Sequence, residues 1–169
     1  YPAIREDLLR SGAVSAMMKT GSPLTEVCTR EDYFCWQGKD PNEQILFDRY
    51  AADEGLIATA GMQLIAGRDL NLSEYPSDST AALINESAAK AMNFKDPVGE
   101  YFKDGKDWLI VGVIKDFVAR SPYRKPAPMV IEGASAGMGF CEIHIKLNKH
   151  IPIDESLSKV GEVFKKYNP

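Results

Sequence analysis

The chain has 169 residues, of which 44% are hydrophobic and 26% are charged, as is usual for a soluble globular domain. Its formal net charge of −4 argues against nucleic acids and anionic membrane surfaces as partners. The longest apolar run without a charge, residues 108–114, is too short to cross a bilayer.

The first part of the chain mixes helical and strand-like patterns. Residues 3–11 carry apolar side chains at helical spacing, and residues 13–19 favour a strand. Residues 20–40 show no clear period, which predicts a long irregular segment. Residues 43–52 are again strand-like.

A short helix is expected over residues 54–60, with Asp53 as its cap and Gly61 at its end. Residues 62–67 then predict a short strand. Residues 68–79 are rich in turn residues and predict a loop.

The central stretch starts apolar and continues with good helix formers, which predicts a strand over residues 81–85 and a helix over residues 86–92. Asn85, Glu86 and Ser87 lie at the junction. They would suit a catalytic site, but the start of a helix explains Asn and Ser at this place better.

A hairpin follows, marked by Asp104 and Gly105 between two apolar runs. Its second arm, residues 108–114, is continuously apolar, as expected for a central strand that is covered on both faces. Residues 127–133 predict another strand.

Residues 140–148 alternate strictly and predict a strand with one apolar face, formed by Cys141, Ile143, Ile145 and Leu147. His144 would then lie on the solvent face. Residues 154–167 predict an amphipathic helix that Asp154 caps, and its inner face is expected to consist of Leu157, Val160, Val163 and Phe164. Interleaved strands and helices around a central hairpin indicate an α+β or mixed α/β fold.

No pattern in the sequence indicates catalysis. There is no G-x-S-x-G motif, no phosphate loop and no calcium loop, and the three cysteines match no zinc or redox spacing. The basic residues 119–126 are more typical of a solvated loop than of a phosphate site. We therefore expect no catalytic residue, no cofactor and no metal.

Six segments occur in a fixed order: WQGKDP, GMQLIAGRDL, ALINESAAKAM, DPVGEYF, IVGVIKDF and PAPMVI, which begin at residues 36, 61, 82, 96, 110 and 126. In this order and spacing they resemble the extracytoplasmic core domain of MacB-like, FtsX-like ABC transporter permeases, especially the subgroup common in Bacteroidetes. The resemblance covers residues 13–169.

The resemblance implies that the signature residues support the fold and are not catalytic. They are Trp36, Gly38, Gly61, Gly67, Arg68, Asp69, Asn85, Glu86, Ala89, Asp96, Pro97, Gly99, Gly112, Val113, Asp116 and Phe117.

It also implies a single core domain with two lobes. A mixed α/β lobe would take approximately residues 1–27 and 81–169, and a mostly β lobe would include part of residues 28–80. We expect the first lobe to hold the strands at residues 13–19, 81–85 and 140–147, packed by the helices at residues 86–92 and 154–167.

In the family this domain lies between two transmembrane helices, which would explain why the chain begins at Tyr1 and stops after "KKYNP". Residues 4–10 would continue the first membrane helix outward. Family members run on into an aromatic segment, so a final strand would be missing here.

The implied protein is an inner-membrane permease with this domain in the periplasm. The domain would be a non-enzymatic module for protein interaction and for coupling cytoplasmic ATP hydrolysis mechanically to export or signalling. Its implied partners are a cytoplasmic ABC ATPase subunit, a second permease copy or homologue, and a periplasmic adaptor or lipoprotein. The cargo is not implied.

An oxidising periplasm would allow a disulfide between Cys28 and Cys35, which share one irregular segment. Free thiols, or a pairing with Cys141, are the alternatives. A competing hypothesis for the whole chain is a free-standing secreted domain, either ligand-binding or hydrolytic, with a site built from residues distant in sequence. Membrane helices encoded on both sides of the chain would exclude it.

Overall fold

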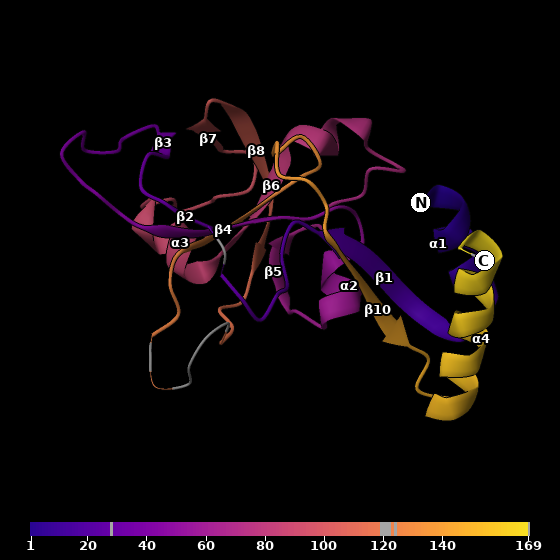
Figure 1. Ribbon diagram of the computed structural model, residues 1–169. Coiled ribbons are helices and arrows are strands. Elements are labelled where there is room, and N and C mark those ends of the chain that lie inside the picture. The colour runs from indigo at the N-terminus through magenta and orange to yellow at the C-terminus, as the bar shows by residue number, and fades with distance from the viewer. Residues whose placement is uncertain (28, 119–122, 124, 169) are drawn as a thin grey trace.

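The computed structural model describes residues 1–27, 29–118, 123 and 125–168. The strands of these residues form a two-stranded sheet and an eight-stranded sheet. Helices flank both sheets, so the fold is mixed α/β, as the sequence predicts (Figure 1). No helix in the described ranges is long and apolar enough to cross a bilayer.

The small sheet lies between helices. Its strands β1 (Val14–Thr20) and β10 (Glu142–Leu147) pair antiparallel. One face packs against α1 (Pro2–Arg10) and α4 (Ile153–Tyr167), with Leu8, Val14 and Met17 at the centre of this core. Figure 1 shows α2 (Leu56–Ala60) on the other side of the two strands.

The large sheet is mixed, and its strands run in the order β2-β4-β9-β6-β8-β7-β3. Strand β5 lies outside this order and pairs with β8. The strands of the large sheet are β2 (Thr29–Glu31), β3 (Cys35–Trp36), β4 (Phe47–Ala51), β5 (Leu64–Gly67), β6 (Ala81–Asn85), β7 (Tyr101–Asp104), β8 (Lys106–Ile114) and β9 (Met129–Glu132). The helix α3 (Glu86–Ala91) and the 3-10 helix η1 (Pro76–Thr80) complete the elements.

The large sheet curls, because its two end strands are close in sequence. β2 and β3 lie at opposite ends of the strand order, yet only residues 32–34 separate them. Such a link reaches about 14 Å, whereas seven flat strands span about 29 Å. Phe34 is fully buried inside the curl, and its ring contacts Phe47 of β4 and Phe102 of β7 at centroid distances of 5.3 Å.

Strand β8 has an apolar core on each face, which confirms the prediction for residues 108–114. Trp108 and Ile110 belong to the core inside the curl, together with α3, whereas Val111 and Ile114 belong to the core shared with α2. The predicted hairpin is also confirmed, and Gly105 at its tip has a φ of 67°.

Most predicted elements are confirmed in type and place. Those at residues 3–11, 13–19, 62–67, 81–85, 86–92, 127–133, 140–148 and 154–167 match α1, β1, β5, β6, α3, β9, β10 and α4. The segment predicted as irregular, residues 20–40, contains the short strands β2 and β3. In residues 43–52 the strand begins only at Phe47.

The expected cap of α2 is wrong. Gly55 occupies the N-cap position with a φ of 87°, and the Oδ2 atom of Asp69 accepts a hydrogen bond from the Ile57 amide at 2.9 Å. The carboxylate of Asp53 instead accepts from the Lys19 amide at 2.5 Å. A residue distant in sequence therefore caps this helix, which no local pattern reveals.

The cap predicted for the last helix is wrong, and its predicted inner face is right for Val160, Val163 and Phe164 but not for Leu157. Pro152 is the N-cap of α4, without a side-chain hydrogen bond, so Asp154 does not cap it. Leu157 is 54% exposed, whereas Ser156 is buried. Because α4 packs against α1 as well as the small sheet, its buried face is turned away from Leu157.

Sheet pairing separates the strands that were expected to share one lobe. β1 and β10 pair with each other, but β6 pairs with β8 and β9 in the large sheet. The lobe boundaries near residues 27 and 81 stay a prediction.

Candidate functional site

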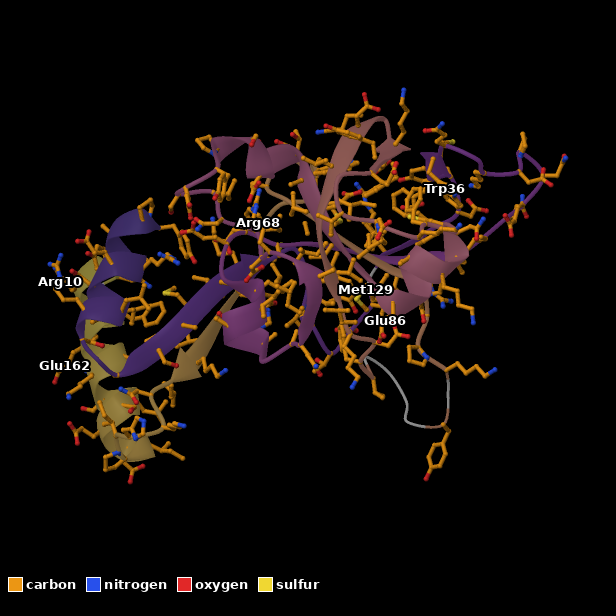
Figure 2. All side chains as sticks on the ribbon, turned by 180° about the vertical axis from the view of Figure 1, so that it is seen from behind. Arg10, Trp36, Arg68, Glu86, Met129 and Glu162 are labelled. Carbon is orange, nitrogen blue, oxygen red and sulfur yellow. The ribbon has the colours of Figure 1, made fainter. Side chains whose placement is uncertain are left out.

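The junction between β6 and α3 is held by one buried side chain, that of Asn85. Its Oδ1 atom accepts hydrogen bonds from the Ala88 amide at 2.9 Å and the Met129 amide at 2.8 Å. Its Nδ2 atom donates to the carbonyl of Ala127 at 2.8 Å. Asn85 therefore caps α3 and also ties β6 to the start of β9, near Met129 in Figure 2.

Glu86 and Ser87 complete this junction through the segment after β8. The Oε2 atom of Glu86 accepts from the Asp116 amide at 3.0 Å. The carboxylate of Asp116 accepts in turn from the Ser87 amide at 3.0 Å and the Ser87 hydroxyl at 2.6 Å. These side chains make reciprocal contacts between chain segments, which supports the capping interpretation over the catalytic one.

A second group of signature residues lies where β5 pairs antiparallel with β8. A Cβ atom on Gly67 would lie 2.2 Å from the Val111 carbonyl oxygen, and one on Gly112 would lie 2.3 Å from that of Arg68. Only glycine permits this approach. The guanidinium of Arg68 binds both carboxylate oxygens of the buried Asp78, at 2.5 and 2.8 Å.

The other signature residues lie in cores or turns. Trp36, Ala89 and Phe117 pack against the two apolar cores of the large sheet, and Val113 is buried within one. Gly38, Gly61 and Gly99 have positive φ angles of 89°, 70° and 97°. Asp96 and Pro97 lie in the segment between α3 and β7. Six signature residues line one cleft of about 430 Å³, and the others are distributed over the fold; the six are Gly67, Glu86, Ala89, Asp96, Pro97 and Val113.

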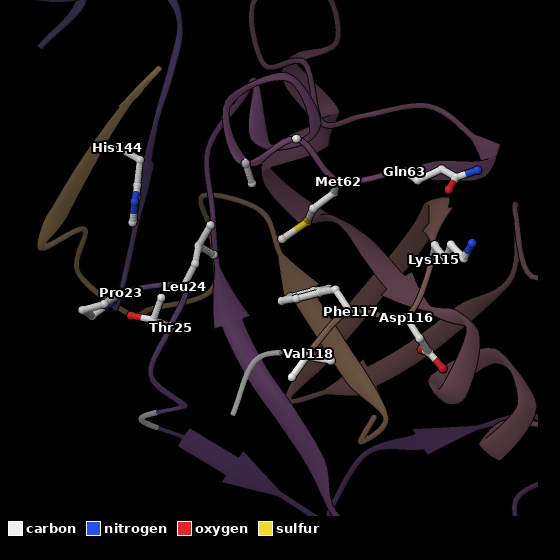
Figure 3. Close-up of a pocket in the computed structure, with 12 residues that line it drawn as sticks. Pro23, Leu24, Thr25, Met62, Gln63, Lys115, Asp116, Phe117, Val118 and His144 are labelled. Carbon is white, nitrogen blue, oxygen red and sulfur yellow. The ribbon is translucent and has the colours of Figure 1, made fainter. Parts of the chain in front are cut away.

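A cleft with a cavity volume of about 660 Å³ lies where the two sheets meet. Its lining includes Leu24, Met62, Phe117 and His144 (Figure 3). Met62, Phe117 and Leu24 point toward the cavity, whereas Lys115 points away from it. Its interior is therefore largely apolar. Among the described residues, no group of three or more His, Cys, Asp or Glu side chains could hold a metal ion.

The sequence predicted His144 on a solvent face, and this prediction is wrong. The Nε2 atom of His144 is 2.7 Å from the hydroxyl of the buried Thr20, and burial lowers the pKa of the imidazole. The reason is α2, which packs across this face of β10, where the ammonium of Lys146 donates to the Ala58 carbonyl at 2.7 Å. On the opposite face Ile143 is 42% exposed and Cys141, which precedes the strand, is also exposed.

The predicted disulfide involves Cys28, which lies outside the described residues, so its pairing with Cys35 stays a prediction. The side chain of Cys35 is exposed in β3.

A buried charge cluster inside the curled sheet was missed from the sequence. Arg49 of β4 contacts Glu132 of β9 at 2.7 Å and Asp104 of β7 at 2.5 Å. Glu132 is fully buried, and burial raises its pKa to about 7. The three residues are far apart in sequence, and each stands beside polar or turn residues that suggest a solvated position. Only the curl of the large sheet brings them together.

Comparison with known proteins identifies the fold. No protein-family model and no curated protein matches the sequence. The periplasmic region of MacB from Actinobacillus actinomycetemcomitans matches 98% of this chain and 73% of its own, with a TM-score of 0.65 and 15% identity. This chain has the fold of the periplasmic region of MacB.

Two further structures share the MacB-like fold. The extracellular domain of the ABC-type transporter YknZ from Gram-positive bacteria has a TM-score of 0.57 and 11% identity, over 91% of this chain and 76% of its own. A domain of a protein assigned as a permease in Porphyromonas gingivalis has a TM-score of 0.60 and 17% identity, over 98% of this chain and 68% of its own.

Proposed function

We propose that the chain is the periplasmic domain of an FtsX-like ABC transporter permease. In this proposal the domain catalyses no reaction, binds other proteins, and couples ATP hydrolysis in the cytoplasm mechanically to export or extracytoplasmic signalling. The observation that carries the proposal is the fold similarity to MacB over 98% of the chain.

The packing of the terminal helices supports a mechanical role. The carboxylate of Asp7 in α1 accepts hydrogen bonds from Lys166 at 2.6 Å and from the Tyr167 hydroxyl at 2.7 Å, both in α4. Figure 1 shows the two ends of the chain on the same side of the molecule. Two membrane helices attached there would act on a single packed unit, formed by α1, α4 and the small sheet.

Backbone hydrogen bonds connect that unit to the large sheet. The Gly21 amide donates to the Ala51 carbonyl at 3.0 Å, and the Asp53 amide donates to the Lys19 carbonyl at 3.1 Å. The Ala52 amide, between them, donates to the Glu132 carbonyl at 2.9 Å. Movement of the terminal helices would therefore reach β4 and β9 through short and stiff connections.

Its partners, on this proposal, are a cytoplasmic ABC ATPase subunit and a second permease copy or homologue, with a periplasmic adaptor or lipoprotein outside. The deciding test uses the full-length permease in membranes. All native cysteines, including the three of this chain, are replaced by serine. Glu162→Cys on the exposed side of α4 then allows two copies to be joined with a bifunctional maleimide (Figure 2).

We expect joining the copies to slow transport and to change the rate of ATP hydrolysis. A monofunctional maleimide on the same variant, and the bifunctional reagent without Glu162→Cys, are the matched controls and should leave both rates unchanged. If the joined copies keep both rates, the mechanical role is wrong and a passive docking platform explains the fold better.

The cleft between the two sheets favours one competing function, a free-standing secreted ligand-binding domain. Its cavity of about 660 Å³ is in the size range of small-molecule sites. The sequence that flanks the chain in its gene separates the two proposals, because membrane helices on both sides would exclude a free-standing domain.

A further inference from the structure

The charge cluster around Arg49 joins three strands that are not neighbours in sequence. The Nε and Nη2 atoms of Arg49 donate to the same oxygen of Glu132, Oε2, at 3.0 and 2.7 Å. Nη2 also contacts the carboxylate of Asp104 at 2.5 Å and the Ala136 carbonyl at 3.2 Å. Arg49 thereby holds the tip of the β7–β8 hairpin against β4 and β9.

One oxygen of this cluster has no donor. Oε1 of Glu132 is buried without a hydrogen-bond partner, although the carboxyl group lies within hydrogen-bonding reach of Asp104. Two ionised carboxylates only accept hydrogen bonds, so their approach is repulsive. A proton on one of them would turn the same contact into an O–H···O hydrogen bond.

The buried charges of the cluster balance only with that proton. Two carboxylates and one guanidinium carry a net charge of −1, and one added proton brings it to zero. The side chains of Arg49 and Asp104 are 12% and 10% exposed, and Glu132 is fully buried, so water screens this charge poorly. Tyr33 and Glu31 also face the cluster. The ammonium of Lys106, opposite Asp104 in the hairpin, is exposed and donates to the Ser135 carbonyl at 2.5 Å, so it is not buried with the two carboxylates.

We propose that Glu132, Asp104 and Arg49 form a proton-operated latch that fastens the β7–β8 hairpin to the curled sheet. With one proton shared between the carboxyl groups the latch is closed, and loss of that proton loosens the hairpin tip. Because β3 pairs with β7, the loosened segment includes Cys35 and Trp36.

The burial of Glu132 makes the latch sensitive to changes of pH near neutrality. Burial raises the pKa of Glu132 from its ordinary value of 4.5 to about 7. The stabilising effect of the proton is therefore complete below pH 4.5 and is lost as the pH rises through about 7. An extracytoplasmic domain would sense the pH of its surroundings in this way, whatever its transporter carries.

Hydrogen exchange of the 169-residue chain at pH 5.5 and 8.5 tests the latch. After correction for intrinsic exchange rates, amides of Tyr101–Asp104 should exchange at least about tenfold faster at pH 8.5, which corresponds to one pKa unit. Amides of α4, which packs with the small sheet away from the latch, should change less.

Two variants remove the carboxyl pair without leaving a buried charge alone. In Glu132→Gln the new amide oxygen still accepts from Arg49, and the new amide nitrogen donates to Asp104. In Asp104→Asn the new amide nitrogen donates to Glu132, and the new amide oxygen accepts from Arg49. In both, the difference between the two pH values should fall below about twofold, and exchange at pH 8.5 should be as slow as in the unchanged chain at pH 5.5.

Asp107→Asn, on the exposed part of the same hairpin, is the matched control and should keep the full difference between the two pH values. The proposal is overturned if the unchanged chain exchanges equally at both pH values. It is also overturned if the difference survives in both Glu132→Gln and Asp104→Asn.

Discussion

The cluster at the start of α3 and the cluster around Arg49 both tie distant segments of the large sheet together, but they differ in how their hydrogen bonds are matched. Asn85 uses its oxygen for two amides and its nitrogen for a carbonyl. In the other cluster two acidic side chains share one guanidinium, and Oε1 of Glu132 has no donor.

The difference shows what each cluster is suited to do. A buried amide whose oxygen and nitrogen both have partners fixes one geometry at any ordinary pH, because it does not titrate. A buried carboxyl pair is stable only with the right number of protons, so it responds to its surroundings. The first is a support for the fold, and the second has the properties of a switch.

The largest effect is expected for Arg49→Met at pH 8.5, because two buried carboxylates then face each other without a cation. The free energy of unfolding should fall by about 3–5 kcal/mol. At pH 5.5 the loss should be smaller, since protonation relieves the repulsion. Urea denaturation at both pH values measures it. Lys103→Met, which removes an exposed ion pair from the same hairpin, should cost less than about 0.5 kcal/mol.

Asn85→Ala should have the next largest effect, a loss of about 3 kcal/mol, because it leaves two buried amides and one carbonyl without partners. In contrast to Arg49→Met, the loss should be equal at pH 5.5 and 8.5. Asn93→Gly is the control, since Asn93 has a φ of 56°, which glycine adopts freely. A pH-dependent loss in Asn85→Ala would contradict the distinction between the two clusters.

Asp69→Ala should have the smallest effect, about 1 kcal/mol, as is typical for the loss of a helix cap. Hydrogen exchange should accelerate at the Ile57 amide, which Asp69 accepts from. Asp53→Ala should instead accelerate exchange at the Lys19 amide in β1 and leave α2 unchanged. Faster exchange of α2 in Asp53→Ala would show that Asp53 caps this helix, as the sequence suggested.

Much of the local structure could be predicted because it depends on neighbouring residues. The run of apolar residues at 108–114 predicted a strand covered on both faces, and Asp104-Gly105 predicted the hairpin. Asn85 and Ser87 indicated the start of a helix, and their motif, together with five others, indicated the fold. Such signals survive in one sequence because spacing along the chain determines turns, caps and the faces of strands.

Tertiary structure decided the features that depend on residues far apart in the chain. The cap of α2 comes from Asp69, and α2 also covers His144, so neither could be assigned from local pattern. Arg49, Asp104 and Glu132 meet only because the large sheet curls, which its strand order and the short link between β2 and β3 impose. The sequence by itself determined the elements and the likeness of their order to a MacB-like domain. The pairing of strands decided which charges are buried together, because burial of a side chain depends on what packs against it and not on its neighbours in sequence.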